Sequence, residues 1–483
     1  MNPYLVLGIL LAYFLVLIGV SWITSKKADT DTFFTGNHKS PWYVVAFGMV
    51  GATLSGVTFI SVPGEVGNSA FSYLQFVLGN LVGYWIVAAV LLPMYYKMNL
   101  VSIYTFLQTR FGERSYKTGS FFFLISKLIG AAFRLFLVAA VLQIAFFDAF
   151  NIPFSLTVIV TIGLIWVYTF RGGIKTIVWT DTLQTLFLVS AVIFTIVAIA
   201  SAMHWNFSDL TKEIWSDKNS QIFFWDWRSQ NNFFKQFIAG IFTTIVIVGM
   251  DQDMMQKNLS CRNKQEAQKN MFVFSFAFLI TVFLFLSLGV LLYSFANSKG
   301  VAIPEKTDDL YPLLALHYLG LPVGIAFLLG ITAAAYSSAD SALTALTTSF
   351  SVDFLKIEKY GEARRQKIKK LSHLMFSVLL ILVILIFKAF NNESIVMAVF
   401  RVAGYTYGPI LGLFIFGMYS KRKVNDKLVP LAGVISPVIC YFISEYSEIL
   451  FNGYKFGFEL LILNGLITMA GLFLISEKYV EEN

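Results

Sequence analysis

The chain has 483 residues, of which 57% are hydrophobic and only 13% are charged, and its formal net charge is +8. Soluble domains carry about 25% charged residues, so this composition excludes an ordinary soluble protein. Two cysteines, Cys261 and Cys440, exclude a disulfide framework, and the four histidines form no cluster that could bind a metal ion.

Apolar runs of about 20 residues, each long enough to cross a bilayer, recur along the whole chain. They predict an all-α polytopic membrane protein with about thirteen transmembrane helices. The expected spans are 3–23, 41–68, 70–96, 118–147, 154–170, 174–203, 233–250, 270–296, 321–352, 371–389, 393–418, 428–446 and 456–475. The first run has no preceding basic residue and no small-residue cleavage site, so we expect a retained span.

The basic residues indicate how these spans are oriented, because Lys and Arg are enriched in cytoplasmic loops. Most of the 36 basic residues fall on one side, in segments 24–40, 97–117, 171–175, 251–269, 353–370, 421–427 and the C-terminus. The opposite side holds Lys212, Lys218, Arg228, Lys235, Lys299, Lys306, Lys388 and Lys455. The sequence therefore predicts a multi-pass protein of the cell (inner) membrane with its N-terminus outside and its C-terminus in the cytoplasm. The basic excess then requires no nucleic acid partner.

The second expected span is interrupted, in the stretch FGMVGATLSGVTFISVPGEVG from Phe47 to Gly67. Its helix-breaking residues are Gly48, Gly51, Gly56, Pro63 and Gly64. A broken helix frees backbone carbonyls, and membrane proteins tolerate this beside a cavity or an ion. Thr53, Ser55 and Thr58 add side-chain hydroxyls at the same place. The stretch is therefore either a binding site or a kink that serves packing.

Two later spans carry charges that should avoid lipid. Arg134 lies in LIGAAFRLFLVAAV and needs a partner, which can be an internal carboxylate, helix-end carbonyls or a substrate anion. Asp181 and Gln184 follow the Arg171-Gly172-Gly173 turn by two helical turns. An ionisable residue inside a membrane span is a functional-site hypothesis by default.

The ninth expected span ends in the polar stretch TAAAYSSADSALTALTTS, from Thr332 to Ser349. Four of its hydroxyls share one helical face, with Ala334 beside them and Asp340 about 60° away; they belong to Ser337, Ser341, Thr344 and Thr348. Oxygen ligands of this kind suit a hard cation. The alternative is that small and hydroxyl residues let neighbouring helices pack closely.

Sequence motifs of enzymes are missing. The chain has no HExxH, no G-x-S-x-G and no phosphate-binding glycine loop before a lysine. We therefore expect no enzyme activity. A channel is disfavoured because the polar clusters are isolated, and a transporter-derived sensor is disfavoured because segment 476–483 is too short to signal.

Three features resemble the sodium/solute symporter family, whose members transport sugars, sialic acid, proline, vitamins and iodide. They are the broken second span, the GG…VWTDxxQ pattern at Gly172–Gln184 and AAAxSSxxS at Ala333–Ser341. The resemblance covers nearly the whole chain and implies a leucine-transporter-like 5+5 inverted repeat in a single transporter domain, 1–483. The repeats would be 41–203 and 233–418, with 1–24 and 428–475 as peripheral helices.

The resemblance also implies ion sites. The family's first sodium site falls on Gly51, Leu54, Ala334, Ser337 and Ser338. Members with a second sodium use positions that match Asp181, Asp340 and Ser341. Asp340 departs from the family pattern because a carboxylate replaces a hydroxyl, so it could strengthen a second site, hold a proton or form an internal pair.

The substrate positions are less well defined. Thr53, Ser55 and Thr58 resemble the sialic acid branch of the family, and a basic residue of that branch corresponds to Arg134. A glutamine of the branch falls near Gln75. The motif VPGEVG, however, is similar to the vitamin, iodide and monocarboxylate branch, so the resemblance leaves a sugar, sialic acid or a carboxylate open.

The sequence therefore predicts a secondary active symporter that imports a small polar organic solute by alternating access. Sodium is the expected coupling ion, and no organic cofactor is expected. The expected partners are the solute, sodium and the lipid bilayer, and we expect a monomer. A proton-coupled symporter of the same fold and a channel-like or sensor derivative are the alternatives.

Overall fold

The computed structural model describes residues 3–25, 30–390, 395–454 and 456–477. Lys26, Lys27, Lys455 and Lys478 of the charge pattern, and the start of the expected span 393–418, lie outside these residues. The described residues are mostly helical. Their two strands, β1 (Lys423–Val424) and β2 (Ser476–Glu477), pair antiparallel, with Lys423 opposite Glu477.

The helices follow the apolar runs along the chain. The first half contains α1 (Pro3–Thr24), α2 (Thr30–Thr35), α3 (Trp42–Thr53), α4 (Gly56–Ser69), α5 (Tyr73–Ile86), α6 (Leu92–Lys97), α7 (Thr105–Arg110), α8 (Glu113–Ala145), α9 (Phe154–Ala202) and α10 (Phe207–Ser216). The second half contains α11 (Phe233–Ile247), α12 (Gln252–Leu259), α13 (Lys264–Ser298), α14 (Leu310–His317), α15 (Leu321–Ser349), α16 (Glu362–Phe390), α17 (Ile395–Tyr419), α18 (Val429–Glu445), α19 (Ser447–Leu450) and α20 (Leu460–Leu474).

Short helical turns extend or connect these helices. They are η1 (Gly36–His38), η2 (Val87–Leu91), η3 (Phe147–Phe150), η4 (Lys218–Ser220), η5 (Thr307–Asp309), η6 (Phe350–Phe354) and η7 (Ile357–Lys359). In the described part of the chain, eight helices are long and apolar enough to cross a membrane, or up to ten if each of two bent pairs is one span. Three shorter apolar helices, 154–169, 429–445 and 460–474, occupy further expected spans. The total of thirteen spans and the inverted repeat stay predictions.

The first bent pair confirms that the second expected span is broken. Helices α3 and α4 meet at 59° across Leu54 and Ser55. Gly51 permits the close approach of α3 to α9, because a Cβ there would lie 2.2 Å from Oγ1 of Thr185. The turn expected at Gly172–Gly173 is also present, since α9 bends at Gly173, where φ is +51°.

The second bent pair corrects the sequence prediction. Segment 251–269 was expected to be a cytoplasmic loop, but Gln252–Leu259 forms helix α12, bent by 67° from α11. Every residue of α12 is buried. The prediction was wrong because polar residues normally indicate a solvated loop, whereas the charges of α12 form ion pairs inside the bundle. Asp253 pairs with Lys127, and Lys257 pairs with Asp181.

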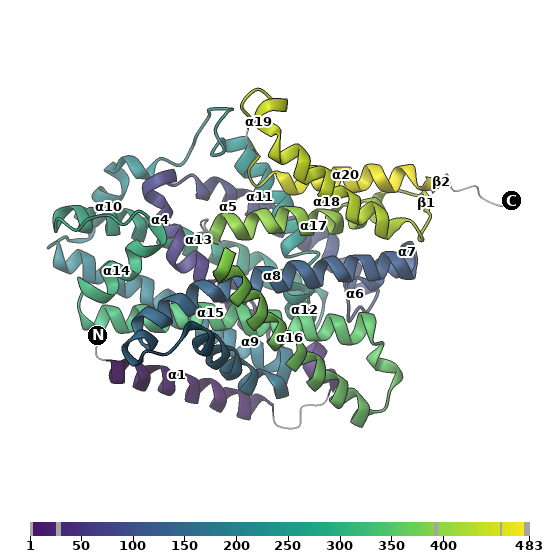
Figure 1. Cartoon of the computed structure of the whole chain (residues 1–483), viewed down its shortest axis with the longest axis horizontal. Coiled ribbons are helices and arrows are strands. Elements are labelled where there is room, and N and C mark those ends of the chain that lie inside the picture. The colour runs from purple at the N-terminus through teal and green to yellow at the C-terminus, as the bar shows by residue number, and fades with distance from the viewer. Residues whose placement is uncertain (1–2, 26–29, 391–394, 455, 478–483) are drawn as a thin grey trace.

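The two ends of the bundle separate the connecting segments as the charge pattern predicted. Helices α10 and α14 lie at one end, on the left of Figure 1, near the start of α1. Helix α7 and the β1–β2 pair lie at the opposite end. Helices α10 and α14, predicted on one side of the membrane, therefore lie at the opposite end from α7 and the β1–β2 pair, predicted on the other side.

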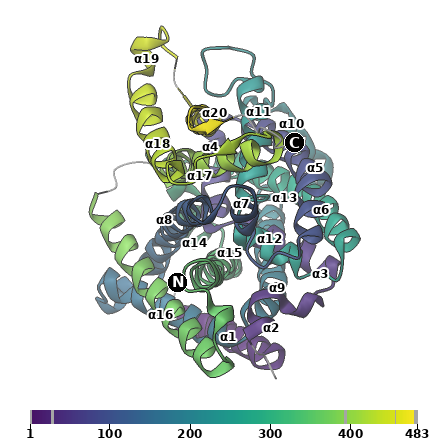
Figure 2. The same cartoon turned by 90° about the vertical axis from the view of Figure 1, so that its right-hand side faces the viewer.

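Helix α15 lies in the interior of the bundle. Figure 2 shows it end-on, surrounded by other helices. Every residue from Gly330 to Ser349 is buried. Small side chains allow neighbouring helices to approach closely, so the polar stretch that opens at Thr332 faces protein and not lipid.

Candidate functional site

The break between α3 and α4 leaves backbone carbonyls without helical partners. Leu54 has φ −80° and ψ 82°, which end the helix, and the Ser55 N–H turns back to donate to the Thr53 carbonyl at 3.1 Å. Among the described residues, no hydrogen bond reaches the carbonyl oxygen of Gly51 or of Leu54. Buried carbonyls of this kind need a partner, so the break offers two free oxygen ligands.

Helix α15 contributes hydroxyls opposite the break. The Ser338 hydroxyl donates to the Ala52 carbonyl at 3.4 Å, which brings α15 directly against the end of α3. Ser337 and Ala334 are fully buried on the same helix. Carbonyl and hydroxyl oxygens are the ligands that a hard monovalent cation prefers. Gly51, Leu54, Ala334, Ser337 and Ser338 therefore fit a sodium ion in the chemistry of their donors.

Asp181 lies beside these hydroxyls on α9. Its Oδ1 accepts from the Ser337 hydroxyl at 2.8 Å, and its Oδ2 accepts from the Ser341 hydroxyl at 3.3 Å. The ammonium of Lys257 lies 2.9 Å from the same Oδ2. The negative charge of Asp181 is thus already matched by a lysine that sequence reasoning had placed in a loop.

Asp340 is fully buried and faces a different partner. Its Oδ2 accepts from the hydroxyl of Tyr168 at 2.8 Å, while Ser341 turns to Asp181. The three residues of the second expected site, Asp181, Asp340 and Ser341, are therefore all buried on α9 and α15. The fit to a second sodium is less direct than at the first site, because Lys257 already supplies a positive charge there.

The Lys257–Asp181 pair ends a chain of buried ion pairs. Lys127 Nζ on α8 lies 3.2 Å from Asp251 Oδ1 and 2.7 Å from Asp253 Oδ2. Lys257 Nζ lies 3.7 Å from the other oxygen of Asp253. The chain Lys127–Asp253–Lys257–Asp181 therefore crosses from α8 through α12 to α9. Lys127 also lines a cavity beside the α3–α4 break.

A cavity of about 1010 Å³ lies beside the α3–α4 break. Of the expected substrate residues, Thr53, Ser55, Thr58 and Arg134 line it. It is also lined by 229–231 and 305–309, from segments that the charge pattern placed outside the cell, and by 457–459 at the start of the last expected span. The cavity volume is at the upper end of the range for small-molecule sites, about 300–1,000 Å³.

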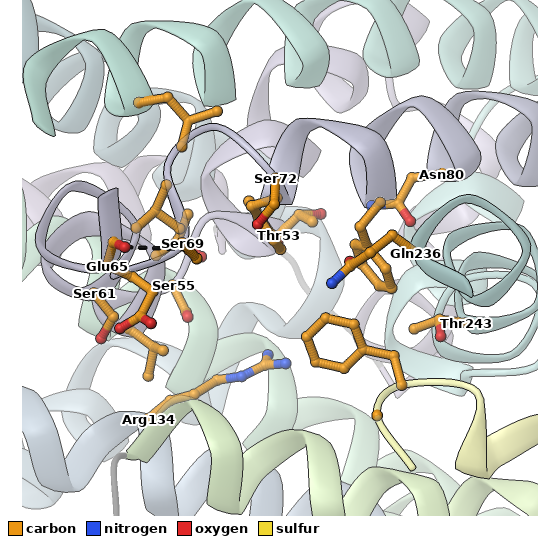
Figure 3. A pocket seen from close by; sticks show the side chains of 18 of the residues that line it. Thr53, Ser55, Ser61, Glu65, Ser69, Ser72, Asn80, Arg134, Gln236 and Thr243 are labelled. Atoms are coloured by element: carbon orange, nitrogen blue, oxygen red, sulfur yellow. Dashed lines mark hydrogen bonds between the residues drawn. The ribbon is translucent and has the colours of Figure 1, made fainter. Parts of the chain in front are cut away.

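Arg134 is a half-buried cation that lines the cavity. Figure 3 shows its side chain reaching from α8 into the space bordered by Ser55, Thr53 and Gln236. No hydrogen bond or ion pair joins its guanidinium to any residue that the structure describes. The internal ion pair that was one of the sequence hypotheses is therefore not formed with a described residue. Thr53 Oγ1 is also buried without a partner.

Gln75 does not line the cavity. It is fully buried, and its amide donates to the carbonyls of Ser72 at 3.3 Å and Asn231 at 2.9 Å. Its Oε1 accepts from the Phe224 N–H at 3.1 Å. Gln75 therefore fixes the loop before α11, and the structure separates it from Thr53, Ser55, Thr58 and Arg134.

Sequence reasoning missed several residues of the site. Lys127 was given no role, and Lys257 and Asp253 lie in segment 251–269, which was expected to be a cytoplasmic loop. Lys235 and Gln236 of α11 line the cavity, but they follow a polar loop and carry no motif. The one available signal was the unusual density of charge between Asp251 and Lys257 directly after an apolar run.

Comparisons with known proteins agree with this geometry. The family model described as "Sodium:solute symporter family" matches residues 33–428. The chain is 26% identical over 440 residues to the sodium/sialic acid symporter NanT of Aliivibrio fischeri, covering 87% of this chain and 84% of that one. It is 23% identical over 404 residues to the human sodium-coupled monocarboxylate transporter 2, covering 81% of this chain and 64% of that one.

Solved structures show the same fold. A substrate-bound, outward-open sodium-coupled sialic acid symporter aligns with a TM-score of 0.83 at 19% identity, covering 98% of this chain and 99% of the other. Mhp1, a nucleobase-cation-symport-1 family transporter, aligns with a TM-score of 0.58 at 14% identity, covering 93% of this chain and 96% of the other. The arrangement of α3, α4, α9 and α15 thus belongs to a known transporter fold.

Proposed function

The chain belongs to the sodium:solute symporter family, and on that premise we propose that its solute is an organic acid whose carboxylate binds Arg134. Family membership makes it a multi-pass, sodium-coupled symporter of small organic solutes and not an enzyme. The relatives named above transport sialic acid and monocarboxylates, two solutes that share a carboxylate. Sialic acid is the first candidate.

The observation that supports the proposal is the unpaired Arg134 in the cavity. A guanidinium presents a planar fork of donors that matches a carboxylate with two parallel hydrogen bonds. A neutral sugar would leave this charge without a counter-charge in a partly buried site, which is unfavourable. The hydroxyls of Thr53, Ser55 and Thr58 line the same cavity and would bind the polar remainder of the solute.

We place the coupling sodium at the α3–α4 break. The carbonyls of Gly51 and Leu54 and the α15 residues Ala334, Ser337 and Ser338 would hold it. There the ion would tie the broken helix to α15, and the same break carries the solute hydroxyl ligands. Binding of sodium would thus order the solute site from one side.

The driving force of this coupling is sufficient for accumulation. A tenfold sodium gradient contributes about 1.4 kcal/mol, and a potential of 100 mV contributes about 2.3 kcal/mol for each charge. One sodium ion therefore supports roughly 500-fold accumulation of a neutral solute. A monovalent anion that enters with one sodium ion moves no net charge, so the membrane potential contributes nothing to its accumulation. A second sodium ion would restore that contribution, and we therefore include a second sodium site at Asp181, Asp340 and Ser341 in the proposal.

The cavity supports an outward-facing conformation. Its lining includes segments 229–231, 305–309 and 457–459, and we propose that these lie outside the cell, with the C-terminus in the cytoplasm. Rocking of one group of helices against the other would then open the opposite side. We further propose thirteen spans, the repeats 41–203 and 233–418, and a monomer in the inner membrane.

The test is thermal unfolding of the detergent-solubilised protein in sodium and in choline, at equal ionic strength. The solutes are sialic acid, lactate and the neutral sugar glucose. A ligand that binds only the folded state raises the melting temperature, so we expect sodium alone to raise it and an acidic solute to raise it further. Glucose should have no effect.

Two variants assign the sites. Arg134→Gln should lose most of the response to the acid and keep the response to sodium, whereas Ser338→Ala should lose the sodium response. Arg114→Gln is the matched control, because Arg114 is an exposed arginine on the same helix. A response to glucose that survives Arg134→Gln would overturn the acidic substrate. Equal melting temperatures in sodium and choline would instead favour proton coupling.

A further inference from the structure

Lys235 is a second cation of the cavity that the proposed function does not use. It lies in the first turn of α11 and lines the cavity, although the residue as a whole is only 6% exposed. Its ammonium is buried and makes no hydrogen bond or ion pair with any residue in the described ranges. A buried charge without a counter-charge is costly, so this position needs an explanation.

Two aromatic rings give the ammonium partial compensation. Its nitrogen lies 3.8 Å from the ring centroid of Tyr454 and 5.4 Å from that of Trp227. Such cation–π contacts are worth about 2 kcal/mol when they are desolvated, which is less than the several kcal/mol that burial of an ion costs. The helix N-terminus also disfavours a cation in the first turn. The site therefore remains electropositive.

Two acids near Lys235, Glu459 and Asp226, form no ion pair with its ammonium. Glu459 lines the same cavity, but its Oε1 accepts from the Tyr454 hydroxyl at 2.8 Å and from the Gly457 N–H at 3.0 Å. These bonds hold the carboxylate against its own loop. Within the described residues, no carboxylate oxygen lies within ion-pair distance of the Lys235 ammonium.

Gln236, the next residue, adds a second buried polar atom without a hydrogen-bond partner. The Gln236 side chain is 7% exposed, and its Oε1 is buried without a hydrogen-bond donor. Its amide nitrogen donates to the carbonyl of Gln230 at 3.3 Å, so its oxygen is the free end. Figure 3 shows Gln236 bordering the cavity. A cation and a neighbouring acceptor together match a carboxylate that carries a hydroxyl.

We propose that Lys235 and Gln236 form an outer subsite for a hydroxylated organic carboxylate, separate from the subsite at Arg134. The inference rests on the proposed function, because it assumes that the solute is acidic. Lys235 shares its part of the cavity with residues 229–231 and 457–459, which belong to the proposed external face. The solute would therefore meet Lys235 before it reaches Arg134 at the broken helix. The cavity volume of about 1010 Å³ leaves room for more than one small solute.

The experiment is calorimetric titration of the full-length protein with sialic acid in sodium, together with transport kinetics in proteoliposomes. The wild type should bind two molecules, one of them weakly. Lys235→Met should bind one and raise the transport KM roughly tenfold, the effect of losing one charge-assisted contact. Lys235→Arg should keep both features. Arg134→Gln should retain only the weak, Lys235-dependent binding.

Lys306→Met is the matched control, because Lys306 is an exposed lysine that lines the same cavity. If Lys235→Met and Lys306→Met bind the same number of sialic acid molecules and have the same transport KM, the outer subsite is overturned. The proposed function at Arg134 is not affected by that result. A wild type that binds no sialic acid and no lactate would instead overturn the acidic substrate itself. Thermal unfolding without solute confirms that each variant is folded before it is compared.

Discussion

The ammonium nitrogen of Lys257 lies 2.9 Å from a carboxylate oxygen of Asp181, and neither side chain is more than 1% exposed. This pair joins α12 to α9 at the place where α9 also receives the hydroxyls of Ser337 and Ser341 from α15. A positive charge of the protein itself thus lies next to the candidate sodium site.

Lys257→Met should destabilise the protein strongly. Removing one partner of a buried ion pair leaves the other charge uncompensated and costs about 3–5 kcal/mol. Lys257→Arg keeps the charge and should cost less. The double variant Lys257→Met/Asp181→Asn should recover part of the loss, because no charge is then left alone at Asp181. Melting temperatures in detergent measure all four proteins, and equal values for Lys257→Met and Lys257→Arg would contradict the pairing.

Gly240→Ala should weaken the packing of α11 on α5. A Cβ at Gly240 would lie 2.1 Å from the carbonyl oxygen of Phe76, a backbone atom that cannot move aside alone. Overpacking of this kind costs about 1–3 kcal/mol. Gly130→Ala is the control, because no atom lies within 4 Å of a Cβ there. Thermal unfolding should show a lower melting temperature for Gly240→Ala and not for Gly130→Ala. An equal decrease in the melting temperature of both variants would refute the close contact.

Asp308→Asn should change how stability depends on pH. Asp308 lies in the turn η5 and lines the cavity, and burial raises the pKa of its carboxyl above the usual 3.8. In the ionised form this carboxylate destabilises the folded state, so the cost is present at neutral pH. It disappears as the pH falls below the ordinary pKa, where the carboxyl is protonated in both states.

Asp308→Asn should therefore melt at a higher temperature than the wild type at pH 7, and the difference should shrink toward about pH 4. Glu305→Gln is the matched control, since Glu305 is an exposed acid that lines the same cavity. A melting temperature difference for Asp308→Asn that is constant across this pH range would show that burial of the carboxylate is not its cause.

Gln75→Ala should loosen the loop before α11. The fully buried Gln75 amide bonds the backbone of Asn231 and of Phe224, and its loss leaves these partly buried groups unsatisfied, at about 1–3 kcal/mol in total. Limited proteolysis should cut the segment between Gln221 and Asn232 faster than in the wild type. Gln265→Ala, at an exposed position, should not change the cleavage rate. Unchanged cleavage in Gln75→Ala would argue against its role as the anchor of the loop.

The sequence was informative where physical constraints act along the chain. The glycines of Phe47–Gly67 predicted a break, and the break lies at Leu54 and Ser55. Apolar length predicted the helices, and the distribution of Lys and Arg predicted which connections share an end of the bundle. Each of these signals is local and needs no knowledge of distant contacts.

The sequence was misleading where a residue depends on a distant partner. The charged residues of α12 were predicted to lie in a loop, because their partners Lys127 and Asp181 are far away in the sequence. The sequence alone does not show that these residues form ion pairs. The resemblance to the sialic acid branch also placed Gln75 among the substrate residues, but α5 turns its amide toward the loop at Phe224 and Asn231. Arg134 shows the same limit, since only the structure reveals that no described side chain pairs with it.

The ion pairs of Lys127 also constrain how the polypeptide is inserted into the bilayer during synthesis. Helix α8 is made 124 residues before Asp251, which corresponds to roughly 6–25 s of translation at about 5–20 residues per second. During that time the lysine has no counter-charge, and its insertion at the centre of an isolated helix costs about 2.5–3.5 kcal/mol. Helix α8 therefore carries this cost until α12 is made, which makes the joining of the two helices a late step in biogenesis.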